Sequence, residues 1–186
     1  METEEILLEA EERMENAVEA LHNAFGCVRT GRASGKVLDR IRVDYYGAMT
    51  PINQLAGVKA PDAHLLVIEP WDKSSLKSIE RAIMESDLGV TPSNDGMVIR
   101  LPFPELTEER RRELVKLCKG YAEDARVSVR NARRDANTAL SKAEKASEIT
   151  EDDLRRGEND VQKLTDKYIA KIDEAFKAKE AEVMEI

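Results

Sequence analysis

The chain has 186 residues and a net charge of −8 at pH 7, because 37 Asp and Glu outnumber 29 Lys and Arg. This length suits one domain or two small ones, and the negative charge argues against a simple nucleic-acid binder, since phosphates repel it. Aromatic residues make up only 4%, which argues against stacking platforms for unpaired bases, whereas 41% hydrophobic residues suffice for a folded core.

Signals for membranes, secretion and disulfides are missing from the sequence. No apolar stretch is long enough to cross a membrane, and the acidic start Met1–Glu5 does not read as a secretory signal. Two cysteines, Cys27 and Cys118, cannot form a disulfide framework and suit a reducing compartment. We therefore expect a cytoplasmic protein with two buried thiols.

The first 30 residues contain no proline and predict one long amphipathic helix. Apolar residues recur at helical spacing along it. This predicted stripe consists of Leu7, Met14, Val18, Leu21, Phe25 and Val28.

Residues 31–104 hold all six prolines and read as a small α/β domain. Alternation over 41–45 predicts a half-buried strand, and the apolar run 65–68 predicts a second one. Asp72 can cap a helix with Leu76, Ile79, Ile83 and Met84 on its buried face, ending near Gly89. Asn94–Gly96 is typical of a tight turn before a strand over 97–101.

Two further helices are predicted in residues 105–186, which again lack proline. Thr107 can cap a helix that continues to about Ala146, with a weak point at Gly120. Thr150 and Asp153 have the spacing of a capping box at the start of the last helix. The second stripe consists of Leu114, Leu117, Tyr121, Ala125, Val129, Ala132, Ala136, Ala139 and Ala143, and the third of Leu154, Val161, Leu164, Tyr168, Ile172, Phe176 and Val183.

Three long stripes can bury their apolar faces against one another. We therefore predict an α+β protein in which a long antiparallel three-helix bundle, residues 1–30 and 105–186, carries an inserted small β/α/β domain, residues 31–104. Two chain segments join the predicted domains. We expect a hinge there, at Thr30, Gly31, Pro102 and Pro104.

The sequence offers no cluster of reactive groups for catalysis. The two histidines, His22 and His64, fall in different predicted domains and lack neighbours at metal-ligand spacing. We expect no enzyme, no bound metal and no cofactor.

Positive charge is concentrated on one face of the second predicted helix. Residues 110–134 carry a net charge of +6. At 100° per residue, seven cations fall within about 100° of one face, interrupted only by Glu123. They are Arg112, Lys116, Lys119, Arg126, Arg130, Arg133 and Arg134.

Two interpretations of this basic face are open. It could be a solvated surface neutralised by acids of neighbouring helices, as in coiled coils. However, residues 126–134 contain four arginines, no lysine and no acid. The forked guanidinium group of arginine can donate two hydrogen bonds to one phosphate. The scarcity of aromatic residues favours structured RNA as the binding partner over single strands with unstacked bases. The competing class is a coiled-coil adaptor that binds only proteins.

Ordered motifs along nearly the whole chain resemble the family of bacterial ribosome recycling factors. The most distinctive is Ala125–Asn137, with the sequence ARVSVRNARRDAN. The others are Arg29–Ser34, Tyr45–Gly47, Thr50–Pro51, Ser86–Gly89, Asp95–Gly96, Ile99–Pro102, Leu106–Arg111, Asp152–Asp153 and Gln162–Asp166.

The resemblance implies an L-shaped molecule that mimics the outline of tRNA. It implies a monomer that binds large-subunit rRNA and, with elongation factor G and GTP, splits the post-termination ribosome into subunits, freeing mRNA and deacylated tRNA. Arg130 and Arg133 would be the main rRNA contacts, and Arg111, Arg29 and Arg32 would support them. Arg126 and Arg134 complete the expected binding residues from the basic face. The small domain would swing about the two joints.

Overall fold

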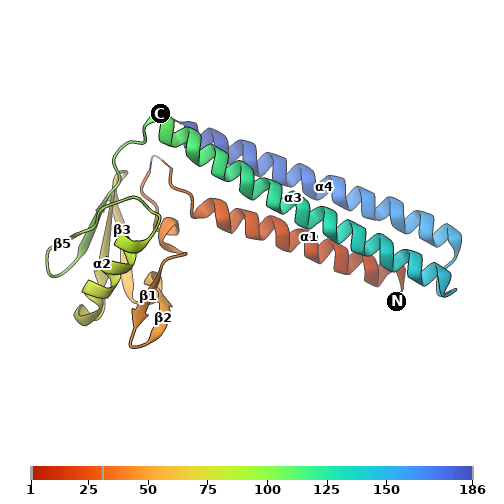
Figure 1. The fold of residues 1–186 in the computed structure, drawn as a ribbon, viewed down its shortest axis with the longest axis horizontal. Helices are drawn as coiled ribbons and strands as arrows, with labels where there is room; N and C mark the ends of the chain where they lie inside the picture. The colour runs from red at the N-terminus through yellow and green to blue at the C-terminus, as the bar shows by residue number, and fades with distance from the viewer. Residues whose placement is uncertain (1, 31, 186) are drawn as a thin grey trace. The chain divides into compact units, whose positions relative to one another are not determined.

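The computed structural model describes residues 2–30 and 32–185 and divides into two compact units (Figure 1). The bundle unit comprises the residues up to Phe25 and Lys116–Glu180. The sheet unit comprises Gly26–Val115 and the residues from Ala181 onward. The observed fold class is α+β, as predicted, with long helices in one unit and β-structure in the other.

The bundle is formed by α1 (Thr3–Gly26), α3 (Glu108–Lys145) and α4 (Glu151–Met184). Helices α1 and α4 run antiparallel to α3 (Figure 1). At 38 residues, α3 is about 57 Å long and passes through Gly120 without a break. The second helix therefore ends within one residue of the position that the sequence predicted.

Local signals set the helix starts. The Thr107 Oγ1 accepts a hydrogen bond from the Arg110 N–H at 3.1 Å, which caps α3. Thr150 and Asp153 form the predicted capping box, each accepting the other's backbone N–H at 3.1 Å. These caps satisfy N–H groups that have no partner within the helix.

The apolar stripes meet in the centre of the bundle. At its far end, Ile6 and Ala10 of α1 pack with Ala136 and Leu140 of α3 and with Val161 of α4. The stripe predicted for α1 included Leu7, which is only partly buried, and left out Ile6 and Ala10, which are buried.

Two predicted core residues are exposed. Leu117 of α3 is 46% exposed, because Cys118 and Ala122 continue the buried line from Leu114 at four-residue spacing. Met84 is 63% exposed, and the buried face of its helix consists of Leu76, Ile79 and Ile83. Both predictions were wrong because each assigned to the buried face an apolar residue that lies just outside it.

The sheet unit contains two antiparallel sheets. Strands β1 (Arg42–Tyr45) and β2 (Ala48–Pro51) form a hairpin. Strands β3 (Ala56–Asp62), β4 (Leu65–Pro70), β6 (Ile99–Pro102) and β5 (Ser93–Asn94) form the larger sheet in that order.

The predicted strands over 41–45, 65–68 and 97–101 correspond to β1, β4 and β6, whereas β2, β3 and β5 were not predicted. Helix α2 (Leu76–Glu85) begins after a short 3-10 turn, where Asp72 accepts the Ser74 N–H at 3.0 Å. The core of the unit joins Ile79 and Ile83 of α2 to Ile68 and Ile99 of the sheet.

Candidate nucleic-acid interface

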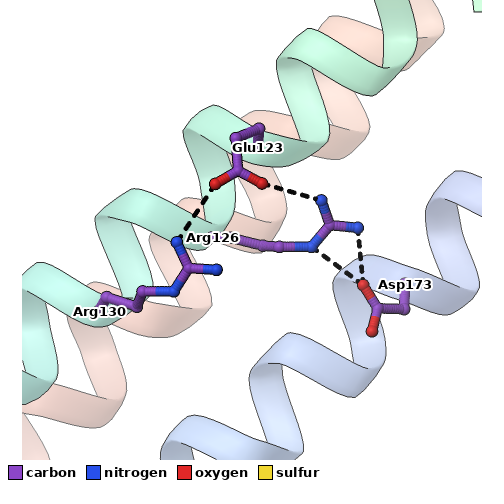
Figure 2. A network of polar contacts seen from close by, with 4 residues as sticks. All are labelled: Glu123, Arg126, Arg130 and Asp173. Atoms are coloured by element: carbon purple, nitrogen blue, oxygen red, sulfur yellow. Dashed lines mark hydrogen bonds and ion pairs between the residues drawn. The ribbon is translucent and has the colours of Figure 1, made fainter.

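The basic face of α3 is present, but its arginines differ in how freely they can bind a ligand. Arg126 is the most constrained. Its Nε and Nη2 donate to the Asp173 Oδ1 of α4 at 3.0 and 2.7 Å, and its Nη1 lies 3.3 Å from Glu123 (Figure 2). Its side chain is only 20% exposed. Arg126 therefore ties α3 to α4, and little of its guanidinium is available to a phosphate.

Glu123 is the acid that interrupts the basic face. It accepts hydrogen bonds from Arg130 at 3.2 Å and from Arg126 at 3.3 Å (Figure 2). These bonds, led by that from Arg130, lower the pKa of the Glu123 carboxyl. Residues 126–134 contain no acid of their own, but Glu123, about one turn before them, and Asp173, on another helix, supply counter-charges to Arg126 and Arg130.

Arg130, Arg133 and Arg134 retain more binding capacity. Arg130 is 48% exposed and makes one hydrogen bond, which leaves its remaining N–H groups available. Arg133 is half-buried, donates to the Gln162 Oε1 at 3.2 Å and has an Nε without a partner. Arg134 is exposed and donates to the Asn131 side chain. Arg133 and Arg134 bind only neutral side chains, and Arg130 shares its one carboxylate partner, Glu123, with Arg126, so phosphate can compete for all three.

The predicted supporting arginines lie in the sheet unit. Arg29 donates to the Pro104 carbonyl and places its guanidinium 5.4 Å from the centre of the Phe103 ring. Burial, and secondarily the nearby Arg110, lower its pKa. Arg111 is half-buried with its Nε unpaired, and Arg32 is exposed, with no partner for its side chain among the described residues. Arg32 is thus the freest of the three, while Arg29 holds two chain segments together.

The four predicted hinge residues have different surroundings. Gly31 lies outside the described residues. Pro102 lies in β6, opposite Leu65 of β4, so the sheet fixes it. The Thr30 Oγ1 and the Pro104 carbonyl both accept hydrogen bonds, from the Arg32 N–H and from Arg29.

Both connecting segments are anchored on one turn of the sheet unit, between β3 and β4. The Ala33 N–H donates to the Ala63 carbonyl and the Phe103 N–H to the His64 carbonyl, each at 2.6 Å. These two hydrogen bonds hold Ala33 and Phe103 on the sheet unit.

Within residues 2–30 and 32–185, no group of three or more His, Cys, Asp or Glu could hold a metal ion. In the same part of the chain, no helix is long and apolar enough to cross a membrane. What the described surface does offer is arginine and lysine on one face of a long helix, an arrangement suited to binding polyanions.

Comparisons with known proteins agree with this arrangement. The sequence profile described as "Ribosome recycling factor" matches residues 21–184. The ribosome-recycling factor of Oleidesulfovibrio alaskensis is 58% identical over 181 residues, 97% of this chain and 98% of that protein. That of Bacillus thuringiensis is 59% identical over 183 residues, 98% of this chain and 99% of its own length.

Solved structures give the same result. A solution structure of a ribosome recycling factor is 44% identical with a TM-score of 0.79, and the match covers 100% of this chain and 99% of that one. Models of the T. thermophilus ribosome recycling factor with E. coli elongation factor G, bound to the E. coli post-termination complex, match at 43% identity and a TM-score of 0.67, over 99% of this chain and 100% of that one. Such similarity over almost the full length confirms the resemblance seen in the motifs, and with it a translation factor rather than an enzyme. The chain belongs to the ribosome recycling factor family.

Proposed function

We propose that this protein recycles ribosomes. With elongation factor G and GTP, it splits the post-termination ribosome into subunits and releases the mRNA and the deacylated tRNA. The observation that carries the proposal is membership of the family over almost the whole chain, including a relative described on a post-termination complex with elongation factor G. The role places it in the cytoplasm, as a monomer without a cofactor.

The rRNA-binding surface in this proposal is the basic face of α3. The phosphates of large-subunit rRNA are bound by Arg130, Arg133 and Arg134. Arg32 and Arg111 make additional contacts with the rRNA. Arg126 and Arg29 have mainly structural roles. The Arg126 guanidinium already binds Asp173, and the Arg29 guanidinium already binds the Pro104 carbonyl. Phosphate recognition by shape and charge needs no aromatic platform, which fits the low aromatic content.

The two predicted domains divide the work. Residues 1–30 and 105–186 form the rigid rRNA-binding arm, and residues 31–104 form the part that moves about the joints. The GTPase supplies the energy, so the chain needs no catalytic group. Its own tasks are affinity, rigidity and a hinge.

A subunit-splitting assay tests the proposal. Post-termination ribosomes are mixed with this protein, elongation factor G and GTP, and light scattering follows their dissociation. Scattering should fall quickly only when all three are present. Scattering that does not depend on this protein would overturn the proposal.

The competing class, an adaptor that binds only proteins, predicts a different result with purified large subunits. A recycling factor should bind them with an affinity that falls steeply with salt, because phosphate contacts release counterions. An adaptor should show neither the binding nor the salt dependence.

A further inference from the structure

The basic surface of α3 does not end at Arg134. A shallow, open depression of about 430 Å³ lies further along the same helix, toward its C-terminal end. Its lining contains four cations, three small polar residues and no acid. The lining residues are Arg133, Arg134, Asn137, Thr138, Ser141, Lys142 and Lys145.

Lys142 and Lys145 are the two cations of the depression that lie outside the basic face predicted from the sequence. Both are exposed, and neither side chain has a hydrogen-bond or ion-pair partner among the described residues. Among these lining cations, Arg133 and Arg134 bind only the neutral side chains of Gln162 and Asn131. The four positive charges are thus not neutralised by partners in the structure.

The polar residues between the cations add hydrogen-bonding capacity. The Asn137 Oδ1 and the Arg133 Nε are buried without a partner, so reorienting these groups toward a ligand breaks no existing bond at either atom. Arg134 and Lys145 are separated by about 16 Å along the helix axis, which is long enough to follow several phosphates.

Lysines in the last turn of a helix also complement its dipole. That role explains a positive charge near Lys145. It does not explain a depression free of acids that Arg133 and Arg134 of the basic face also line.

We propose that this depression is a second RNA-binding subsite, in which Lys142 and Lys145 hold the sugar–phosphate backbone of structured RNA next to the segment held by Arg130 and Arg133. The inference rests on the proposed function and extends it. The contact with rRNA then runs along α3 almost to the α3–α4 turn, and its occupant is recognised by phosphate geometry without base-specific contacts.

Removing the two charges tests the subsite. The variant Lys142→Gln/Lys145→Gln is compared with wild type for binding to purified large subunits over a series of salt concentrations. Each lost phosphate contact lowers the slope of log K against log salt by about 0.9, so the slope should fall by about 2 and the affinity at low salt by roughly tenfold or more. The matched control Lys59→Gln/Lys77→Gln removes two exposed charges from the sheet unit and should keep the wild-type slope.

A second variant separates the subsite from the helix dipole. Ser141→Glu leaves both lysines in place and adds a carboxylate one turn before Lys145, where the pair stabilises a helix. The subsite predicts an unchanged or higher melting temperature together with weaker binding to large subunits.

Wild-type affinity and slope in both variants would overturn the subsite while leaving the proposed function intact. If instead the wild-type protein neither binds large subunits nor splits ribosomes, the proposed function itself fails.

Discussion

Among the arginines of α3, local partners decide which are structural and which are available to bind RNA. Arg126 and Arg130 are four residues apart and share Glu123, yet only Arg126 also reaches Asp173 on α4. That partner is 47 residues away in the sequence, so no local pattern reveals it. The sequence could predict the basic face, but not which of its members the fold had already used.

Charge reversal at Arg130 and Arg133 should therefore separate binding from folding. The double variant Arg130→Glu/Arg133→Glu should lose at least tenfold in affinity for large subunits, because two phosphate contacts become repulsive, and should melt near the wild-type temperature. Salt-dependent binding and thermal unfolding measure the two effects.

Arg126→Gln serves as the matched control on the same face. It should lower the free energy of unfolding by about 1 kcal/mol through loss of the link to Asp173 and change the affinity much less. Wild-type binding by the double reversal would show that this face is not the interface.

Asp95 makes the stability of the sheet unit depend on pH. The N–H groups of Val98 and Met97, followed by Arg100, lower the pKa of its carboxyl from 3.8 to about 2. Since the charged form is favoured in the folded state, its contribution to stability is fully present above pH 4 and is lost as the pH falls toward 2.

The variant Asp95→Asn should therefore be less stable than wild type at pH 6, with a difference that shrinks toward pH 2. Denaturant unfolding of both proteins across this range measures it. A difference that stays constant with pH would mean that the carboxylate charge does not stabilise the turn.

At the scale of the element, two helical glycines have opposite surroundings. Gly120 in α3 has open space where a Cβ would stand. At Gly157 in α4, a Cβ would lie 2.9 Å from Leu140 Cδ2 and 3.3 Å from Thr3 Cγ2. Leu140 is fully buried, so it has little room to move.

Alanine should consequently stabilise one helix and destabilise the other. Gly120→Ala should raise the free energy of unfolding by about 0.5–1 kcal/mol, whereas Gly157→Ala should lower it by about 1–3 kcal/mol through overpacking. Urea unfolding followed by helical circular dichroism measures both, and Leu140→Val should partly rescue Gly157→Ala. Equal effects of the two alanines would contradict this account of the packing.

The elements that could be predicted are those with local signals. The caps at Thr107 and Thr150 and the alternation in β1 depend on neighbours within a few residues. Strand β5 has two residues and β3 contains glycine and proline, so neither carries a periodic pattern. Their pairing comes from the strands beside them, which no single segment encodes.

For the whole molecule, the net charge of −8 is the sum of a mostly acidic sequence and a basic segment, residues 110–134, with a net charge of +6. In the proposed binding mode, the acidic parts of the surface repel RNA and the basic face of α3 attracts it. On this proposal, the acidic composition helps to orient binding, and the low aromatic content fits an RNA held by its phosphates.

The proposed hinge concerns the whole molecule and can be tested by a reversible cross-link. In a background with Cys27→Ser and Cys118→Ala, the substitutions Thr30→Cys and Pro104→Cys place one thiol on each joint, on residues next to or bonded to Arg29. A short reducible cross-linker then prevents the joints from changing independently. The cross-linked protein should bind large subunits as before and fail to split ribosomes with elongation factor G and GTP, because in the proposed function the swing about these joints drives splitting. Reduction of the linker should restore splitting in the same sample, which excludes damage by the substitutions. Splitting at the uncross-linked rate while the linker is intact would show that the motion does not pass through these joints.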